Sequence, residues 1–399
     1  MEGEQTSNRI KAEIKRRGYR LYEVAKALYI SERTLYNYCT GETPIPRITL
    51  ERLAKLLECP ISALVDNAEA DGQADTLQLS TLPGKGTRMF SETLDVAEEL
   101  ISQVWSLRRA AHITDAEKSV RRLNALFTYF HEQLAPPLHL DQRFRLLDIQ
   151  VQRLNAATAL ENKRYDEAIT IYTQELQEAK SLDNPAVSAL ALKGLGKELE
   201  RKGRIQEAVM LLEDARDYSL RASKPLIAFV HSYLSRVYAS AGDALRFERA
   251  IQTGLTVAHS FKGQYEDGTD FVYSWSPISA LLAEQSWGYL SLGEPRKTLA
   301  MRNDLECAIL EGQDYRVYAW IPLDWARAYL MLGDVEAGIA CARLFLSRVT
   351  AMKSPHATNQ AFKYVKELEQ AGYGDVAAVR EFREELYTAQ AQQRRMQKS

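Results

Sequence analysis

Residues 31–40 carry polar side chains whose types and spacing suit hydrogen bonding to nucleic acid. Arginine and asparagine can contact base edges through paired hydrogen bonds, while serine and threonine hydroxyls contact bases or phosphates. Because a helix turns every 3.6 residues, these side chains would share the outward face of one short helix. The candidate DNA contacts on this face are Ser31, Glu32, Arg33, Tyr36, Asn37 and Thr40. A helix that presents such a face fits the major groove of DNA.

Two consecutive short helices are predicted to hold this face outward. Ser31 can cap the start of the second helix, and Gly41 can follow its end in the left-handed conformation that costs glycine least. Apolar residues at helical spacing predict a core shared by both helices. The expected core positions are Val24, Ala25, Leu28, Leu35 and Tyr38.

Residues 8–65 resemble the Xre/Cro-type helix-turn-helix regulators. Asn8–Arg17 is similar to the first helix of that family, and Ile48–Val65 to its fourth helix and closing turn. The resemblance implies base contacts from Ser31, Glu32, Arg33 and Asn37, with Thr40 near the DNA backbone. This sequence departs from the family at Leu21, where a glutamine usually touches phosphate.

The charge of this segment is compatible with DNA without requiring it. Residues 1–65 contain 11 Lys or Arg and 8 Glu, a formal balance of +3. Basic residues of the first helix and the following turn are phosphate candidates, with Arg17 taken as a contact. They are Arg9, Lys11, Lys15, Arg16, Arg17 and Arg20. The alternative is a four-helix domain that contacts only proteins, with these basic residues on a solvated face.

The length and composition of the chain limit the classes of protein to which it can belong. A length of 399 residues favours two or three domains, and the net charge of −2 excludes a uniformly basic coating protein. The four cysteines have no metal-binding spacing and are expected to be buried thiols in a reducing compartment. The sequence shows no secretory signal and no apolar run of membrane-spanning length, so the protein is expected to be cytoplasmic and without a membrane partner.

Catalytic motifs are absent from the sequence. It lacks Gly-x-Ser-x-Gly, His-Glu-x-x-His and a Gly-x-Gly-x-x-Gly loop after a strand, and its six histidines are dispersed. The acids Glu266, Asp267 and Asp270 lie together in a predicted loop, where we expect them to face water. We therefore expect no enzyme activity, cofactor or metal site.

Three segments are predicted along the chain: a helix-turn-helix domain at 1–67, a flexible linker at 68–88, and helical repeats at 89–399. The linker is rich in Asp, Gly, Ser, Thr and Gln and has no apolar period. It includes Pro83-Gly-Lys-Gly-Thr87, but Leu79 stands where a phosphate-binding loop needs glycine.

The C-terminal segment reads as repeated helix pairs with a glycine at each internal turn. Glycine tolerates the positive φ that such a turn requires. The turn positions are Lys163 (in the glycine slot), Gly203, Gly242, Gly293, Gly333 and Gly372. They are spaced by 39, 40 or 51 residues, and the long gap contains an insertion at about Phe261–Ser276. The pair at 91–137 lacks the glycine and is expected to cap the stack.

These pairs resemble tetratricopeptide repeats, which coil into a superhelix with a concave inner face. The resemblance implies an all-α fold in which a right-handed α-solenoid follows the helix-turn-helix domain. In that family the first helix of each pair lines a groove. The positions that match are Arg153, Lys193, Lys197, Phe229, Tyr233, Arg236, Trp287, Trp320, Asp324 and Arg327. Cations interleaved with large aromatics suit an extended peptide, although they can also be packing and solvated residues.

The combination resembles the peptide-responsive transcription regulators of bacterial quorum sensing. It implies a homodimer that binds a palindromic operator in double-stranded DNA and responds to a short peptide or another small effector. The rival hypothesis is a protein-interaction scaffold that the helix-turn-helix domain tethers to DNA, with no small effector. The sequence does not choose between repressor and activator.

Overall fold

The structure, a computed structural model, describes residues 2–28, 30–40, 42, 45, 47–60, 63–64, 85–134, 136–262, 266–273, 275–352 and 354–398. Throughout these ranges the regular secondary structure is helical, as predicted. The chain divides into two compact units, Met1–Glu98 with Leu126–Leu147, and Glu99–Ala125 with Asp148–Ser399. None of the helices in the described ranges is long and apolar enough to span a membrane.

Four helices form the N-terminal part of the first unit. They are α1 (Glu2–Arg16), α2 (Leu21–Ala27), α3 (Glu32–Thr40) and α4 (Arg47–Leu56). The predicted core residues Val24, Ala25, Leu28 and Leu35 are buried. The prediction for Tyr38 is wrong: Cys39, four residues after Leu35, completes the buried face, because positions i and i+4 lie one above the other on a helix.

The predicted N-cap of α3 is confirmed. The backbone N–H of Thr34 donates to Oγ of Ser31 at 3.0 Å, which satisfies one amide that the helix start leaves unpaired. The proposed closing residue, Gly41, lies outside the described residues.

The next three helices are α5 (Lys85–Arg109), α6 (Ile113–Gln133) and α7 (Asp141–Glu161). Residues 85–88, predicted as linker, therefore belong to a helix, whereas 68–84 lie outside the described residues. Within the first unit, four phenylalanine rings hold the ends of α5, α6 and α7 together, with centroids 4.9–6.1 Å apart: Phe90, Phe127, Phe130 and Phe144.

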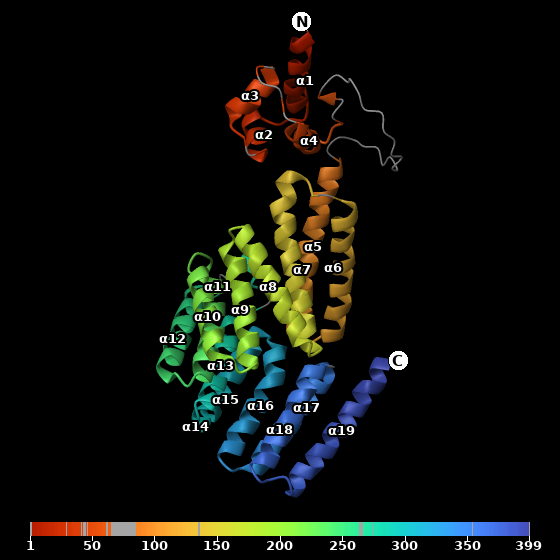
Figure 1. The fold of residues 1–399 in the computed structure, drawn as a ribbon. Helices are drawn as coiled ribbons and strands as arrows, with labels where there is room; N and C mark the ends of the chain where they lie inside the picture. Colours follow the sequence, from red (N-terminus) through yellow and green to blue (C-terminus); the bar gives the residue numbers. More distant parts are fainter. Residues whose placement is uncertain are drawn as a thin grey trace. The chain divides into compact units, whose positions relative to one another are not determined.

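The second unit consists of successive antiparallel helices (Figure 1). After α7 they are α8 (Tyr165–Ser181), α9 (Pro185–Arg201), α10 (Ile205–Ser219), α11 (Lys224–Ser240), α12 (Ala244–Ser260), α13 (Pro277–Ser291), α14 (Pro295–Ala300), α15 (Arg302–Gly312), α16 (Tyr315–Met331), α17 (Val335–Met352), α18 (Pro355–Gln370) and α19 (Ala377–Lys398).

The turns inside the pairs have the predicted geometry. Each glycine at a predicted turn has a positive φ, from 74° at Gly242 to 89° at Gly372, and Lys163 adopts φ 61° in the same position. At Gly203 its N–H donates to the carbonyl of Glu200, and the next N–H donates to Leu199, both at 2.9 Å. These bonds satisfy carbonyls at the helix end.

The first helices of successive pairs form an inner layer. Helix α9 packs against α11, α11 against α13, α13 against α16, and α16 against α18. Ala168 and Ala208 of the second helices are fully buried, as expected for close helix approach. The insertion (residues 261–276) lies between α12 and α13, where it was predicted, and contains the short 3-10 helix η3 (Thr269–Phe271). It contacts α9 and α11 through η3.

None of the four cysteines forms a disulfide, and the prediction that all are buried is confirmed for two of them. Cys39 and Cys341 are buried and Cys59 is half-buried, but Cys307 is exposed. It lies on α15, the short helix that takes the place of a regular second helix after α14.

Candidate nucleic-acid interface and ligand cavity

The outward face of α3 carries the predicted contacts. Ser31, Glu32, Arg33 and Tyr36 are exposed, while Asn37 and Thr40 are half-buried. Leu35 and Cys39 are buried behind this face, so the helix presents its polar side chains on the side away from the core.

Two of these side chains are held in place by neighbours. With its amide nitrogen facing acceptors, Asn37 donates to the carbonyl of Arg33 at 3.1 Å and to the carboxylate of Glu42 at 3.2 Å. The Nζ of Lys11 on α1 lies 5.6 Å from the centre of the Tyr36 ring. Lys11 thereby adds a cation beside the α3 face.

Arg17 lies in a different environment. Its side chain is only 12% exposed, and its Nε donates to Glu13 at 2.9 Å. Arg16 also donates to Glu13, and these bonds lower the pKa of Glu13. Arg17 therefore anchors a carboxylate of α1, and a role on phosphate would need that pair to open.

The second unit contains a cavity of about 550 Å³. All ten residues predicted to line the groove line this cavity. They come from α7, α9, α11, α13 and α16, the first helices of their pairs. The positions chosen from the repeat pattern therefore lie around one cavity.

Other lining residues lie where the repeat pattern gave no signal. Trp105 and Arg108 belong to α5, and Val272, Tyr273 and Trp275 to the insertion. Polar contacts hold the insertion in the wall. Among them, Arg153 donates to the carbonyl of Phe271 at 3.0 Å, and Asp270 accepts from the backbone N–H of Ser223 at 2.6 Å. The expectation that Asp270 faces water is therefore wrong, because its carboxylate accepts a hydrogen bond from the residue that precedes α11.

One side of the cavity is internally neutralised. Arg236 lies over the Trp287 ring at 3.7 Å and donates to Glu200 and Glu284 at 3.0–3.2 Å. Burial opposes its charge, but Glu284 and Glu200 outweigh this and raise the pKa of Arg236. Burial raises the pKa of the neighbouring Asp324 to about 6, against the opposing effect of Arg327 and Arg236. These groups are largely engaged with one another.

Another side of the cavity is rich in cations. Burial, then Arg153 and then Lys197, lower the pKa of Lys193 to about 7. Glu175 is buried close enough to interact with Arg153 and Lys193, and burial raises its pKa to about 8. Its two carboxyl oxygens have no hydrogen-bond partner. This acid is therefore largely protonated near neutral pH and does not balance the cations.

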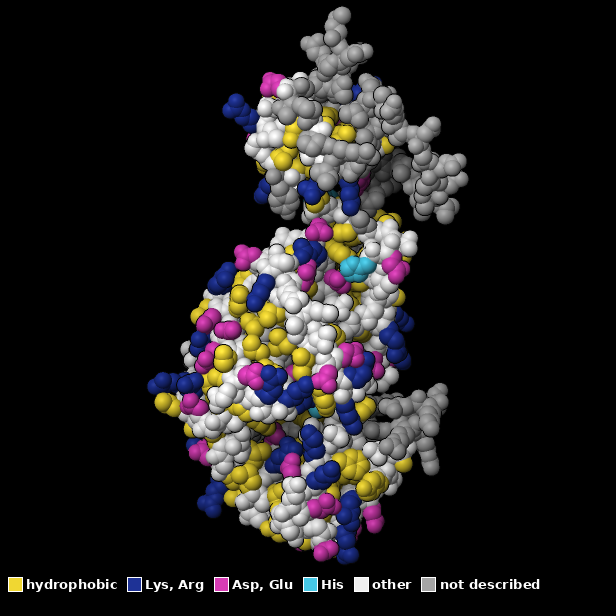
Figure 2. Space-filling view, in the orientation of Figure 1, with side chains coloured by type: hydrophobic (Ala, Val, Ile, Leu, Met, Phe, Trp, Pro, Cys, Tyr) yellow, Lys and Arg dark blue, Asp and Glu magenta, His cyan; other side chains and the backbone are white. Residues whose placement is uncertain are grey.

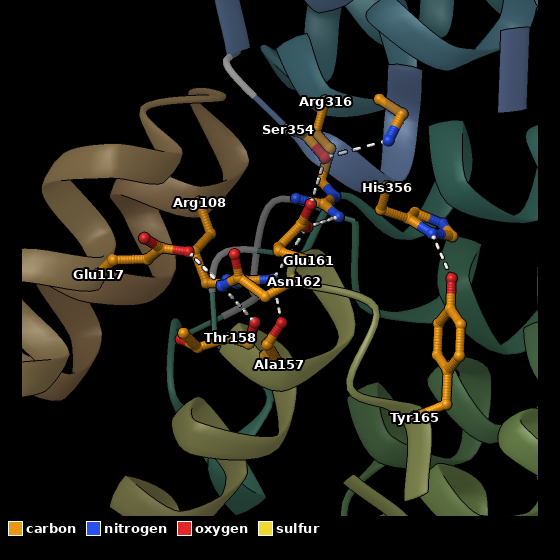
Figure 3. A network of polar contacts seen from close by, with 11 residues as sticks. Arg108, Glu117, Ala157, Thr158, Glu161, Asn162, Tyr165, Arg316, Ser354 and His356 are labelled. Atoms are coloured by element: carbon orange, nitrogen blue, oxygen red, sulfur yellow. Dashed lines mark hydrogen bonds and ion pairs between the residues drawn. The ribbon is translucent and has the colours of Figure 1, made fainter. Parts of the chain in front are cut away.

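A polar network joins the first repeat of the second unit to the last ones (Figure 3). Glu161, at the end of α7, accepts from Arg108 at 3.3 Å, from Arg316 of α16, and from Oγ of Ser354 at 2.6 Å. Ser354 in turn caps α18 by accepting from the N–H of Ala357 at 3.2 Å. Burial opposes ionisation of Glu161, but Arg316 and Arg108 hold its pKa well below the ordinary value. We call these four residues, Arg108, Glu161, Arg316 and Ser354, the Glu161 clasp.

A second contact lies beside the clasp. The hydroxyl of Tyr165 is 3.2 Å from Nδ1 of His356, and the His356 ring lies 5.4 Å from that of Trp320. The residues that this contact joins are 191 positions apart. The helix array thus closes on itself around the cavity.

The visible outer face of the repeat helices carries mixed charge. Figure 2 shows basic and acidic side chains interspersed over the visible face of the repeat helices. In the described ranges no group of three or more His, Cys, Asp or Glu side chains could hold a metal ion.

Comparison with known proteins identifies the N-terminal part. Residues 10–64 match the family model described as Helix-turn-helix. No curated protein matches the chain.

Two solved structures are similar to this chain. One is the signal transduction ATPase with numerous domains (STAND) protein with a tetratricopeptide repeat sensor from Pyrococcus horikoshii, at 13% identity and a TM-score of 0.44. The match covers 95% of this chain and 60% of that one, so the chain spans about three fifths of its length. The other is the apo form of the competence regulator ComR from Streptococcus vestibularis, at 12% identity and a TM-score of 0.33, covering 93% of this chain and 99% of that one.

The family match coincides with the four N-terminal helices and with the capped, outward-facing α3. Residues 10–64 therefore form a helix-turn-helix domain, a type of domain that binds DNA in transcription regulators.

Proposed function

We propose that this chain is a sequence-specific transcription regulator whose repeat cavity binds a small effector, most simply a short peptide, and thereby changes DNA binding. The single observation that carries the proposal is the joining of a helix-turn-helix domain to a cavity lined by all ten predicted groove residues. A concave site with aromatic walls and convergent polar groups is the usual form of a ligand site.

On the DNA side, α3 is the recognition helix. Ser31, Glu32, Arg33 and Asn37 contact base edges, with Tyr36 and Thr40 beside the backbone. To reach a base, Asn37 must exchange its bond with Glu42 for one with the base, so Glu42 restrains this side chain in the free protein. Arg17 contributes to phosphate binding only if it leaves Glu13.

On the effector side, the cavity offers two kinds of contact. The rings of Phe229, Tyr233 and Trp287 supply apolar area at low entropic cost, and the cations suit carboxylates. An effector changes DNA affinity only if it binds one conformation of the regulator better than another. We propose a homodimer whose two recognition helices bind half-sites of a palindromic operator, spaced by one helical turn of DNA or a multiple of it.

Selection of bound genomic fragments by the purified chain tests DNA reading. The intact protein should enrich specific fragments with paired half-sites. Asn37→Ala should weaken binding to them by about 1–3 kcal/mol and relax the preference at one base position. Lys180→Ala, which changes an exposed lysine of α8, should leave binding unchanged.

Two further results separate this proposal from the alternative of a protein-interaction scaffold. Unchanged operator affinity for Asn37→Ala would contradict the assignment of α3. Adding a peptide fraction from culture medium should raise the melting temperature of the intact protein, because a ligand that binds the folded state stabilises it. If DNA binding is specific but no fraction changes the melting temperature or the DNA affinity, the repeats act as a protein-interaction scaffold.

A further inference from the structure

The cations that line the cavity fall into two groups. Five arginines have a carboxylate within 4 Å: Arg108, Arg201, Arg236, Arg316 and Arg327. Arg109, Arg153, Lys193 and Lys197 have no such partner in the described part of the chain, and the last three of these lie together. Arg153 instead donates to the side chain of Gln150 and to the carbonyl of Phe271. Positive charge is therefore unbalanced at these three residues.

These three cations lie in one region of the cavity. Lys193 and Lys197 are separated by one turn of α9, and their Nζ atoms lie 4.8 and 5.1 Å from the centre of the same Tyr233 ring. Lys193 also lies 5.0 Å from the centre of the Phe229 ring. Arg153, which is 6% exposed, interacts electrostatically with Lys193 and lies over the Trp105 ring.

The nearby acids do not neutralise these cations. Glu175 is buried, and its raised pKa keeps it mostly uncharged near neutral pH. Glu198 is 1% exposed and lies 3.3 Å from Arg201, and burial raises its pKa against the opposing effect of Arg201, Lys197 and Lys193. Like charges held together away from water repel one another, and burial together with Arg153 and Lys197 lowers the pKa of Lys193 to about 7. An anion that enters this region gains from Arg153 and Lys197 and favours the protonated form of Lys193.

We propose that Arg153, Lys193 and Lys197 form an anion-binding subsite that seats the negatively charged end of the cavity's ligand, a carboxylate or a phosphate. We call these three residues the anion subsite. The inference rests on the proposed function, because it assumes that the cavity is the ligand site. Phe229 stacks edge-on against Tyr233 and Trp275, at centroid distances of 5.4 and 5.0 Å. These rings receive an apolar or aromatic group next to the anion.

Calorimetric titration of the full-length chain with matched probes tests the subsite. N-acetyltryptophan carries a carboxylate beside an aromatic ring, and N-acetyltryptophanamide has the same shape without the charge. The acid should bind about 10- to 100-fold more tightly than the amide, the range expected for charge-assisted hydrogen bonds. Inorganic phosphate, titrated alone and in competition with the acid, distinguishes a phosphate site from a carboxylate site.

Two variants keep the test specific. Lys193→Met and Lys197→Met remove one charge each while retaining a long side chain, and each should reduce the preference for the acid by at least fivefold while leaving amide binding nearly unchanged. Lys180→Met, on the exposed face of α8, is the matched control and should behave as the unmodified protein. A melting curve of each variant checks that it is folded.

The outcomes are distinct. A preference for the acid, or displacement of the acid by phosphate, that is lost in both cavity variants supports the subsite and names its anion. Equal affinity for acid and amide would overturn the anion subsite while leaving the cavity as a ligand site. Absence of binding by every probe would overturn the subsite and remove support from the proposed effector site, whereas specific DNA binding would still stand.

Discussion

Replacing Glu161 by glutamine should loosen the closure of the repeat array. Glu161 is 2% exposed and accepts hydrogen bonds from two guanidinium groups and one hydroxyl. Removing one partner of a buried ion pair costs about 3–5 kcal/mol, because the remaining charge is left unbalanced. Glutamine retains one acceptor oxygen, so we expect about 2–4 kcal/mol for Glu161→Gln.

Hydrogen exchange of the intact chain measures the loss of stability at the helix that Glu161 holds through Ser354. In Glu161→Gln, amides at the start of α18 should exchange roughly 30- to 1,000-fold faster, since each 1.4 kcal/mol corresponds to a factor of ten. Glu167→Gln is the control, because Glu167 pairs with Arg164 in an exposed position at 2.7 Å. Such a pair contributes less than about 1 kcal/mol. Unchanged exchange at α18 in Glu161→Gln would refute a clasp that holds the array closed.

The pH dependence of the same variant follows from the pKa of Glu161. Because the folded-state pKa lies below the ordinary value of 4.5, the carboxylate contributes its full stability above about pH 4.5 and loses it as the pH falls further. The stability difference between the unmodified chain and Glu161→Gln should therefore shrink below pH 4.5. A difference that grows on acidification would mean that Glu161 is protonated in the folded state.

Three further predictions concern the turns, the helix packing and the cavity. Lys163→Gly should stabilise the chain by about 0.5–1 kcal/mol in denaturant titration, because lysine pays for its φ of 61° at a turn built for glycine; a loss of stability would contradict this. Gly288→Ala should cost about 1–2 kcal/mol, since an added Cβ would lie 2.2 Å from the fully buried Phe247 ring, whereas Gly374→Ala meets only ordinary contacts and should be nearly neutral. Binding of N-acetyltryptophan should strengthen by up to about tenfold from pH 8 to pH 6, as Lys193, whose pKa burial lowers to about 7, gains its proton; titrations at the two pH values that agree would contradict its participation.

Local signals in the sequence were sufficient for the elements and for much of the cavity. The N-cap at Ser31 and the glycine at each turn depend on a few neighbouring residues, so their spacing predicted the structure there. The groove residues followed from position within a repeat, because the first helices of successive pairs pack in series. Whether these residues bind DNA or an effector stays a prediction.

Contacts between distant parts of the chain could not be predicted in the same way. Glu161 and Arg316 are 155 residues apart, and no periodic pattern relates a carboxylate at the end of α7 to an arginine at the start of α16. Their meeting depends on the summed curvature of all the intervening pairs. Likewise, the insertion has no repeat partner, so its contribution of Val272, Tyr273 and Trp275 to the cavity wall had no signal in the sequence.

The most direct measurement is the affinity of the intact chain for a selected genomic fragment, with and without a saturating peptide fraction from culture medium. The proposed regulator predicts a change of at least fivefold, the lower range of allosteric coupling. Phe229→Ala, which alters the cavity wall, should abolish the change while Lys180→Ala retains it. Specific DNA binding by the unmodified chain that no fraction alters would contradict an effector-controlled regulator.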